Sequence, residues 1–301
     1  MSGTPILEIE NVGRVYKRGG FFGGHSFKAV DDVSFTLPET PQVFSIVGES
    51  GSGKTTLARM VLRLVEPTTG TIRLMGKPLN GRERVDNLTF RRLVQPIFQN
   101  PFEAFSAYPP IEAYLTRTAL NLRIARTEKE AVAATDAALR SVGLSYERIR
   151  GKYIRQFSGG ELQRISVARA LIPNPKLIVA DEPVSMVDAS LRMSIVNLFR
   201  QIVTEKGVSF IYITHDLSTA YYLSDHVAIM NTGRVIEQGA PGDILANPGE
   251  AYTRELMAAI PTIGARWAEL DEIDRHYAHE RTRDDKSAGK HQQQHFQAPS
   301  H

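Results

Sequence analysis

The chain has 301 residues and no cysteine. The absence of cysteine excludes a disulfide framework, thiolate zinc sites, cysteine-ligated iron–sulfur clusters and a catalytic thiol, and it suits a reducing compartment. No stretch approaches the ~18 apolar residues that a membrane span requires. The N-terminal segment 1–14 also lacks the basic start and long apolar centre of a signal peptide. We therefore expect a soluble, cytosolic chain whose chemistry comes from other side chains.

An excess of charge of one sign is also missing. The chain carries 36 Lys and Arg residues against 33 Asp and Glu residues, a formal net charge of +3. Surfaces that bind nucleic acid usually show clustered basic side chains instead of such a balance, so we expect no nucleic-acid partner. Hydrophobic residues make up 42% of the chain, which is enough for the core of one large domain or two modest ones.

Hydrophobic patterning predicts an α/β fold. Residues 111–144 are Ala-rich and lack strand-like alternation, which indicates helices. Apolar runs of strand length precede and follow this region, at Leu7–Ile9, Val33–Leu37, Val43–Val47, Thr71–Met75, Leu177–Ala180, Val208–Ile213 and Val227–Met230. Among the later runs, those without alternation indicate strands covered on both faces of a parallel sheet. We therefore predict an α/β core interrupted by a helical insert.

A phosphate-binding loop follows the apolar run Val43–Val47. The residues fit the pattern G-x-x-x-x-G-K-S/T and are followed by a helix-compatible segment. Glycines let the backbone wrap round an anion, and the positive end of the helix dipole lies at the same place. The loop therefore predicts a nucleotide polyphosphate site, with Lys54 neutralising the β- and γ-phosphates and the Thr55 hydroxyl ligating Mg²⁺. Its candidate residues are Gly48, Glu49, Ser50, Gly51, Ser52, Gly53, Lys54, Thr55 and Thr56.

Two further candidates end apolar runs. Asp181 and Glu182 follow Leu177–Ala180; Asp181 would hold a magnesium-bound water, and Glu182 would polarise an attacking water. His215 ends the run that begins near Val208, at the carboxyl edge where open α/β sheets bind ligands. The alternatives are structural, since an Asp-Glu pair also occurs in helix caps and turns, and a single histidine is usually a structural residue.

The segment 157–161, Phe-Ser-Gly-Gly-Glu, precedes Leu-Gln-Arg and an Ala-rich helix. It resembles the signature motif of ABC-transporter ATPase subunits, whose usual form is Leu-Ser-Gly-Gly-Gln, so Phe157 and Glu161 depart from that form. Ser158, Gly159 and Gly160, which should face phosphate, match the motif. The alternative is a helix cap, because Ser is a favoured N-cap residue.

Other positions resemble further elements of this family. Gln99 looks like the Q-loop residue, which would ligate Mg²⁺ and report the γ-phosphate to the insert. Asp188 matches the D-loop aspartate, and His215 matches the switch histidine. Tyr16 resembles the aromatic that stacks on adenine, although an aromatic at a strand end also packs on a core. The resemblance implies a P-loop NTPase (RecA-like) fold with a mainly parallel sheet, an N-terminal antiparallel β subdomain and an inserted helical subdomain.

Two stretches, 17–24 and 251–261, resemble the oligopeptide/dipeptide importer branch of this family. We expect an ATPase domain over 1–265, with the helical insert at about 100–170 and the branch's C-terminal segment at about 240–265. The polar residues 266–301 should form a disordered tail, because few apolar side chains offset the entropy of ordering. Its histidines invite a metal interpretation, but a solvated tail is expected; they are His276, His279, His291, His295 and His301.

The resemblance implies an ATP-hydrolysing subunit that energises peptide uptake from the cytoplasmic face of the inner membrane. Its cofactors would be ATP and Mg²⁺. Its partners would be a second ABC ATPase subunit (a paralogue or another copy), two integral membrane permease subunits and, indirectly, an extracytoplasmic solute-binding protein. Oligosaccharide and nickel are alternative cargoes. A soluble ABC-type ATPase of translation or DNA repair, a small-molecule P-loop kinase and a binding module without turnover are alternative functions.

Overall fold

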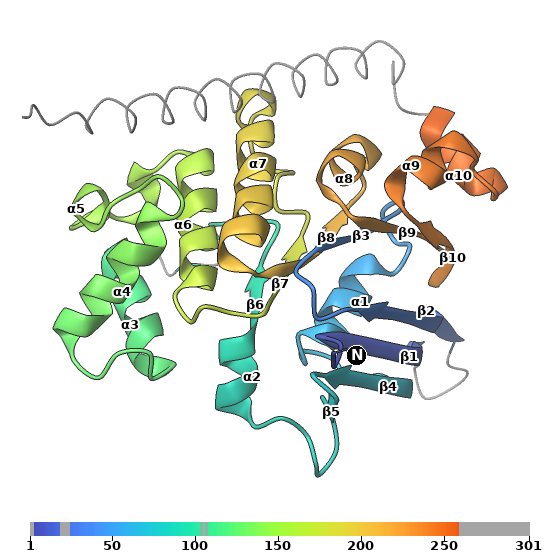
Figure 1. Ribbon diagram of the computed structural model, residues 1–301, viewed down its shortest axis with the longest axis horizontal. Helices are drawn as coiled ribbons and strands as arrows, with labels where there is room; N and C mark the ends of the chain where they lie inside the picture. Colours follow the sequence, from blue (N-terminus) through green and yellow to red (C-terminus); the bar gives the residue numbers. More distant parts are fainter. Residues whose placement is uncertain (1–2, 19–24, 103–104, 106–107, 259–301) are drawn as a thin grey trace, which may run out of the picture. The chain divides into compact units, whose positions relative to one another are not determined.

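The described strands form two sheets (Figure 1). The computed structural model describes residues 3–18, 25–102, 105 and 108–258. The four-stranded sheet has the order β2-β1-β4-β5, and its paired strands are antiparallel. Its strands are β1 (Leu7–Arg18), β2 (His25–Leu37), β4 (Thr69–Leu74) and β5 (Lys77–Pro78). This sheet confirms the predicted N-terminal antiparallel layer.

The six-stranded sheet has the order β10-β9-β3-β8-β7-β6. β3 pairs in parallel with β8 and β9, and β7 pairs in parallel with β6 and β8; only the β9–β10 pair of this sheet is antiparallel. Its strands are β3 (Val43–Val47), β6 (Val94–Ile97), β7 (Leu177–Asp181), β8 (Ser209–Thr214), β9 (His226–Asn231) and β10 (Arg234–Gly239). The predicted, mainly parallel core is confirmed.

The predicted strands of the six-stranded sheet end within two residues of the observed bounds, but the first two strands of the chain are much longer than expected. β1 and β2 run beyond their apolar cores as a ribbon whose register shifts three times. Such bulges interrupt the alternation of buried and exposed side chains, so the apolar pattern marked only part of each strand. β5 and β10 were not among the predicted strands.

Helices cover both faces of the six-stranded sheet. The described helices α3 to α6 lie between β6 and β7 in the chain and stand beside the sheet (Figure 1). The helices are α1 (Lys54–Val61), α2 (Asn87–Leu93), α3 (Ile111–Asn121), α4 (Glu128–Arg140), α5 (Tyr146–Ile149), α6 (Gly159–Leu171), α7 (Ala189–Lys206), α8 (Leu217–Leu223), α9 (Pro241–Ala246) and α10 (Ala251–Ala258), with a 3₁₀ turn at Ile154–Gln156. In the described part of the chain, no helix has the length and apolar character needed to span a bilayer.

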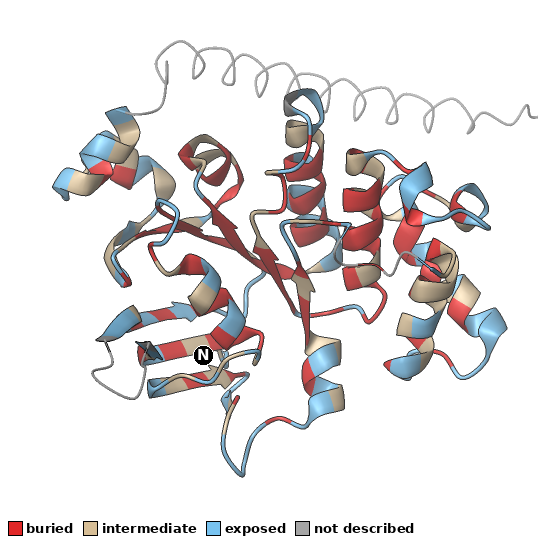
Figure 2. Cartoon of the chain, turned by 180° about the vertical axis from the view of Figure 1, so that it is seen from behind, coloured by how far each residue is buried: buried red, intermediate tan, exposed pale blue. Residues whose placement is uncertain are grey.

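The core consists of two hydrophobic clusters on opposite faces of the six-stranded sheet. In β8, Phe210 and Tyr212 belong to the cluster under α3 to α7, whereas Ile211 and Ile213 belong to the cluster shared with α1 and the four-stranded sheet. This alternation follows from the two-residue period of a strand. It explains why β8 is buried throughout (Figure 2) and why its sequence shows no polar alternation.

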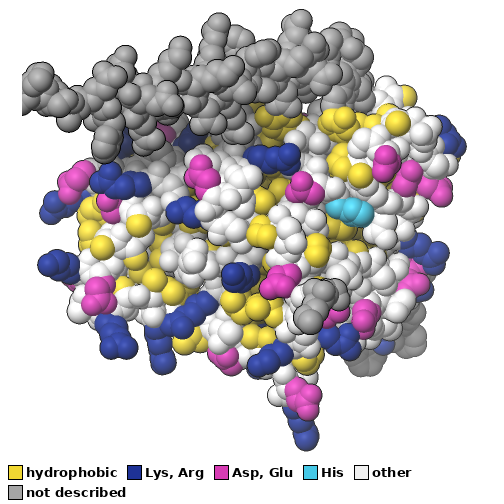
Figure 3. Space-filling view, in the orientation of Figure 1, with side chains coloured by type: hydrophobic (Ala, Val, Ile, Leu, Met, Phe, Trp, Pro, Cys, Tyr) yellow, Lys and Arg dark blue, Asp and Glu magenta, His cyan; other side chains and the backbone are white. Residues whose placement is uncertain are grey.

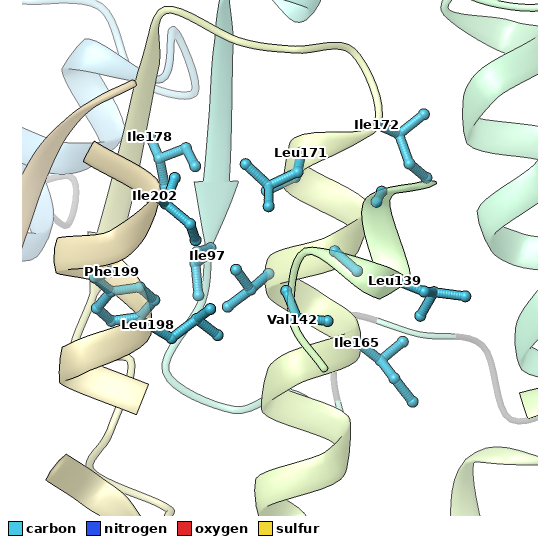
Figure 4. Close-up of a cluster of buried hydrophobic side chains, with 14 of the residues drawn as sticks. Ile97, Leu139, Val142, Ile165, Leu171, Ile172, Ile178, Leu198, Phe199 and Ile202 are labelled. Atoms are coloured by element: carbon cyan, nitrogen blue, oxygen red, sulfur yellow. The ribbon is translucent and has the colours of Figure 1, made fainter. Parts of the chain in front are cut away.

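The larger cluster joins the sheet to the inserted helices. Figure 4 shows Phe199 and Ile202 of α7 beside Ile97 of β6 and Ile178 of β7. Fully burying one such side chain stabilises the fold by about 1.5–3 kcal/mol. The strands that carry the candidate site are therefore held from both faces.

The surface mixes charges of both signs. Basic and acidic side chains are interspersed over the face drawn in Figure 3, as the near balance of the composition suggests. Some predictions concern residues outside the described part of the chain. These are the expected tail 266–301 with its five histidines, and residues 19–24 and 259–261 of the two stretches that resemble the importer branch.

Candidate functional site

The phosphate-binding loop joins β3 to α1, and two of its glycines are required by close backbone contacts. A Cβ atom on Gly48 would lie 2.1 Å from the carbonyl oxygen of Met230. Gly53 has φ 106°, and a Cβ atom there would lie 2.2 Å from the carbonyl oxygen of Ala29. Because no side chain fits at either position, the loop can lie directly against β2 and β9. The motif therefore has a structural basis in this chain.

Lys54 lies over this loop and is only 4% exposed. Its Nζ donates hydrogen bonds of 2.7 Å to the carbonyl oxygens of Gly48 and Glu49 and a bond of 3.3 Å to Ser52 Oγ. Burial lowers the pKa of Lys54, while the charges of Glu182, Asp181 and Glu49 act in the opposite direction. Because the ammonium group is buried, a bound anion would stabilise its charge. Its hydrogen bonds to the two carbonyl oxygens could then be replaced by bonds to that anion.

Asp181 meets the loop at the carboxyl edge of the sheet. Thr55 Oγ1 donates to Asp181 Oδ1 at 3.4 Å, across 126 residues of chain. The contact arises because β7 is two strands from β3, with β8 between them. Burial raises the pKa of Asp181 and the charge of Glu182 adds to this, whereas the hydrogen bond from Thr55 and the charge of Lys54 lower it. A buried carboxylate of this kind would be stabilised in its charged form by a cation.

Glu182 stands between two other predicted catalytic residues. Its Oε1 lies 3.2 Å from His215 Nδ1, and its Oε2 accepts a 3.2 Å bond from Gln99 Nε2. These side chains follow β7, β8 and β6, which are neighbours in the sheet. The Glu182 side chain is 19% exposed and that of His215 is 60% exposed. The structure thus places all three predicted catalytic side chains in one group.

The backbone of Glu182 separates its side chain from that of Asp181. Its φ is 45°, in the left-handed region that disfavours a side chain. Its N–H donates to the carbonyl oxygen of Ile213 at 2.9 Å, and its carbonyl oxygen accepts from Ser185 Oγ at 2.9 Å. These bonds hold the unfavourable conformation, and strained residues held in this way are typical of functional sites.

The signature-like segment is a capped helix start on the inserted helices. Ser158 Oγ accepts a 3.2 Å bond from the Glu161 N–H, and Glu161 Oε2 accepts from the Ser158 N–H at 3.1 Å. Glu161 Oε1 also accepts from Arg148 Nη2 at 2.8 Å. The pKa of Glu161 is lowered, first by the bond from the Ser158 N–H and then by Arg148. The helix-cap interpretation is therefore correct, and it leaves open a second role for the same residues.

The signature-like and D-loop-like residues lie together, but away from the phosphate-binding loop. A Cβ atom on Gly159 would be 3.5 Å from the carbonyl oxygen of Met186, two residues before Asp188, and Asp188 is the exposed N-cap of α7. Ser158 forms these hydrogen bonds with Glu161, within its own helix end. α6 and α1 lie on opposite sides of β6 and β7 in Figures 1 and 2. One chain therefore does not bring Ser158 and Lys54 into one site.

Tyr16 lies within β1 and has aromatic and cationic neighbours. Its ring stacks on that of Phe27 with centroids 5.6 Å apart, and the Arg14 guanidinium lies 4.7 Å from its centroid. Phe27 is 58% exposed. The pair is an aromatic stack near the end of the ribbon where β1 ends and β2 begins.

Three residues near these sites were not identified from the sequence as site residues. Tyr252 of α10 accepts a hydrogen bond from the Glu49 N–H, Gly233 donates to the carbonyl oxygen of Ser52, and Arg148 pairs with Glu161. No motif spacing links these positions to the loop or to the signature-like segment. Only the tertiary fold brings them there.

The sheet order, the loop between β3 and α1 and the acidic end of β7 define a P-loop NTPase fold. Residues 30–185 match the family model described as "ABC transporter". The chain is 36% identical to the oligopeptide transport ATP-binding protein OppF of Bacillus subtilis, over 85% of this chain and 82% of that protein. It is 38% identical to a putative peptide import ATP-binding protein of Brucella ovis, over 87% of this chain and 80% of that protein. This chain belongs to the ABC transporter family.

Solved structures agree with this assignment. The dimeric, post-hydrolysis structure of the ATP-binding cassette MJ0796 bound to ADP and Pi matches with a TM-score of 0.68 and 25% identity, covering 78% of this chain and 98% of that chain. The structure of cbiO1 from Clostridium perfringens, part of an ABC transporter complex, matches with a TM-score of 0.70 and 25% identity, covering 89% and 99%.

Proposed function

We propose that this chain is the ATP-binding and ATP-hydrolysing subunit of an ABC importer that energises the uptake of peptides. The observation that carries the proposal is the convergence of Lys54, Thr55, Asp181 and the Gln99–Glu182–His215 group at one edge of the sheet. The loop with Lys54 would bind phosphate, the Asp181 carboxylate lies beside the Thr55 hydroxyl, and the Glu182 carboxylate is oriented to accept a proton. Membership of the ABC transporter family supports the same function.

ATP binding would exchange the hydrogen bonds of Lys54. Its Nζ now donates to two loop carbonyl oxygens, and these bonds would give way to stronger, charge-assisted bonds to the β- and γ-phosphates. The remaining phosphate contacts are assigned to the N–H groups of the loop and of the first turn of α1. Tyr16 is assigned to adenine stacking, where the base would lie against the Tyr16–Phe27 pair.

The residues beside the loop fit Mg²⁺. Magnesium in nucleotide sites is usually held by one or two carboxylates or hydroxyls together with phosphates and water. Thr55 and Asp181, 3.4 Å apart, are such a set, and Gln99 would complete it. Among the described residues no group of three or more acidic or histidine side chains forms a protein-only metal cage. When bound, Mg²⁺ would supply charge neutralisation at the phosphates.

Hydrolysis is assigned to the Glu182 group. A water attacks the γ-phosphorus, its proton passes to the Glu182 carboxylate, and the bond from the γ-phosphorus to the bridging oxygen breaks to give ADP and phosphate. Both carboxylate oxygens have partners, so the side chain is oriented before the substrate arrives. His215, which is more exposed, would contact the γ-phosphate, and Gln99 would pass its presence to α3.

A second ATPase subunit would complete the site, because Ser158 and Lys54 lie apart within one chain. A partner's Ser158 loop would face the γ-phosphate held by this chain, with Asp188 at the same boundary. A ligand favours the closed state of the two subunits only if it binds that state more strongly than the open state. The contact between the γ-phosphate and the partner's Ser158 loop would exist only in the closed state and would provide this difference in affinity. The partner is a paralogue or another copy of this chain.

The remaining partners follow from the proposed importer. Two membrane permease subunits would receive the motion of the inserted helices, and a solute-binding protein would deliver cargo to them, with this chain peripheral at the cytoplasmic face of the membrane. Peptide is the proposed cargo because relatives are named for oligopeptide transport and peptide import. Oligosaccharide and nickel are the alternative cargoes.

The test is ATP hydrolysis by the chain alone and in proteoliposomes with its permease and solute-binding protein. We expect Mg²⁺-dependent hydrolysis that peptide stimulates in the reconstituted system and that Lys54→Ala abolishes through loss of nucleotide binding. Lys77→Ala, an exposed lysine of β5, is the matched control. Stimulation by ribosomes or DNA instead of membrane partners would reject the importer in favour of a soluble ATPase.

A further inference from the structure

The phosphate-binding loop is held from outside by the C-terminal part of the chain. The hydroxyl of Tyr252, in α10, accepts a 3.1 Å hydrogen bond from the Glu49 N–H, although 203 residues separate them. The Gly233 N–H, in the β9–β10 turn, donates to the carbonyl oxygen of Ser52 at 2.9 Å. The two contacts lie near opposite ends of the loop. They engage main-chain groups, so the sequence of the loop does not reveal them.

The peptide unit between Gly48 and Glu49 is bonded on both sides. Its oxygen accepts from Lys54 Nζ at 2.7 Å, and its N–H donates to Tyr252. When Lys54 turns to the phosphates, its bond to this peptide is lost. The hydrogen bond from the Glu49 N–H to Tyr252 then remains to keep this peptide unit from rotating. The bond to Tyr252 therefore matters most in the state that binds nucleotide.

Tyr252 is itself fixed in place by β10. The Glu237 carboxylate accepts hydrogen bonds from Thr253 Oγ1 at 2.6 Å and from the N–H groups of Gly249 at 2.9 Å and Glu250 at 3.4 Å. Thr253 is fully buried. Because these bonds engage the start of α10 and the residue next to Tyr252, the position of the tyrosine hydroxyl is set by the sheet. The hydroxyl is thus preorganised and not a chance surface contact.

We propose that Tyr252 is a positioning residue for the nucleotide site, which sets nucleotide affinity by fixing the Gly48–Glu49 peptide. The inference rests on the proposed ATPase function. A loop that samples other peptide orientations binds only while in the competent one, so its apparent affinity falls by the competent fraction. The same loss applies to the ground state and the transition state, so the KM for ATP changes and kcat does not.

The experiment is Tyr252→Phe in the full chain, which keeps the ring and removes the hydroxyl. We expect the KM for Mg-ATP and the Kd for ADP to rise about two- to tenfold, the effect of one net hydrogen bond, with kcat within about twofold and a melting temperature within a few degrees of the parent value. Amide exchange at Glu49 should accelerate. Tyr108→Phe, at a side chain that is 91% exposed, is the matched control and should change none of these values.

Glu237→Gln gives a second approach to the same bond. We expect it to raise the KM for ATP in the same direction, and to add little when combined with Tyr252→Phe, because both act through one hydroxyl. An unchanged KM in Tyr252→Phe, or a fall in kcat with a lower melting temperature, overturns the inference. If the unaltered chain binds no nucleotide and Lys54→Ala changes nothing, the proposed function fails instead, and the two failures are distinguishable.

Discussion

The substitution Glu182→Gln tests the chemistry of the site most directly. The glutamine keeps the size and shape of the side chain and removes its negative charge. Glu182 now interacts with His215 through one oxygen and with Gln99 through the other, each at 3.2 Å. A glutamine oxygen accepts only one of these contacts, because its other terminal atom is a donor. The substitution therefore removes the proton acceptor and one polar contact.

The two losses differ greatly in size. One polar contact at a part-exposed site contributes about 0.5–1.5 kcal/mol to folding, so the variant should fold and melt within a few degrees of the parent. Loss of a positioned general base lowers the rate of a reaction about 10²- to 10⁴-fold. Lys54 and Thr55 remain, so nucleotide binding should persist. The expected variant binds ATP, turns over extremely slowly and accumulates as a closed dimer.

The assay measures phosphate release and ATP binding, with the mass of the ATP-loaded protein determined by light scattering in the presence of its cognate ATPase partner. Glu83→Gln, at an exposed glutamate, is the matched control. Hydrolysis within about threefold of the parent value would refute the assignment of Glu182 as the base. A variant that stays monomeric with ATP and every partner subunit would refute the two-subunit site.

Two further predictions concern carboxylates outside this group. Arg148→Ala removes the ion pair with Glu161 and leaves the Glu161 charge unneutralised beside Ser158. ATP-dependent dimerisation should therefore weaken by about threefold, as for a part-exposed ion pair. Adding Glu161→Gln should restore dimerisation, and light scattering that shows no restoration would contradict this explanation. For Glu237, burial raises the pKa, but the bonds from Thr253 and two backbone N–H groups outweigh it and leave the pKa below 4.5. The stability that Glu237 contributes is thus present above pH 4.5 and is lost as the pH falls through the lower pKa that Glu237 has in the folded protein. Proteolysis near α10 should therefore increase over this pH range in the parent protein. In Glu237→Gln, which has no carboxyl group to protonate at this position, the rate of proteolysis should not show this increase.

The parts of the site that are local in sequence could be predicted from it. The loop 48–56 has a fixed spacing, because the glycines, the lysine and the hydroxyl must meet one phosphate chain. Asp181 and Glu182 could be placed because an uninterrupted apolar run ended at them. The predicted carboxyl edge of the sheet likewise placed His215, since parallel strands present their carboxyl ends together.

Contacts that depend on strand order and on distant segments could not be predicted. The group of Gln99, Glu182 and His215 requires that β6, β7 and β8 be neighbours, and no local pattern contains that order. The bond from Glu49 to Tyr252 joins main chain to side chain across 203 residues, so it leaves no motif. The extended parts of β1 and β2 were missed for a different reason, since bulges interrupt the side-chain period that marks a strand.

The contact of Gln99 with Glu182 joins the middle of the sheet to the chain that leads into the inserted helices. Glu182 follows β7, which pairs with strands on both sides, whereas Gln99 follows β6, which among the described strands pairs only with β7. The chain after Gln99 leads to α3 and the inserted helices, which are anchored to the sheet mainly by one hydrophobic cluster. A displacement of those helices would therefore reach the Glu182 group both through Gln99 and through Ile178 and Ala180 of β7, which pack in the same cluster. Because Gln99 is bonded to the proposed base at 3.2 Å, we propose that the inserted helices influence the orientation of Glu182 in part through this bond.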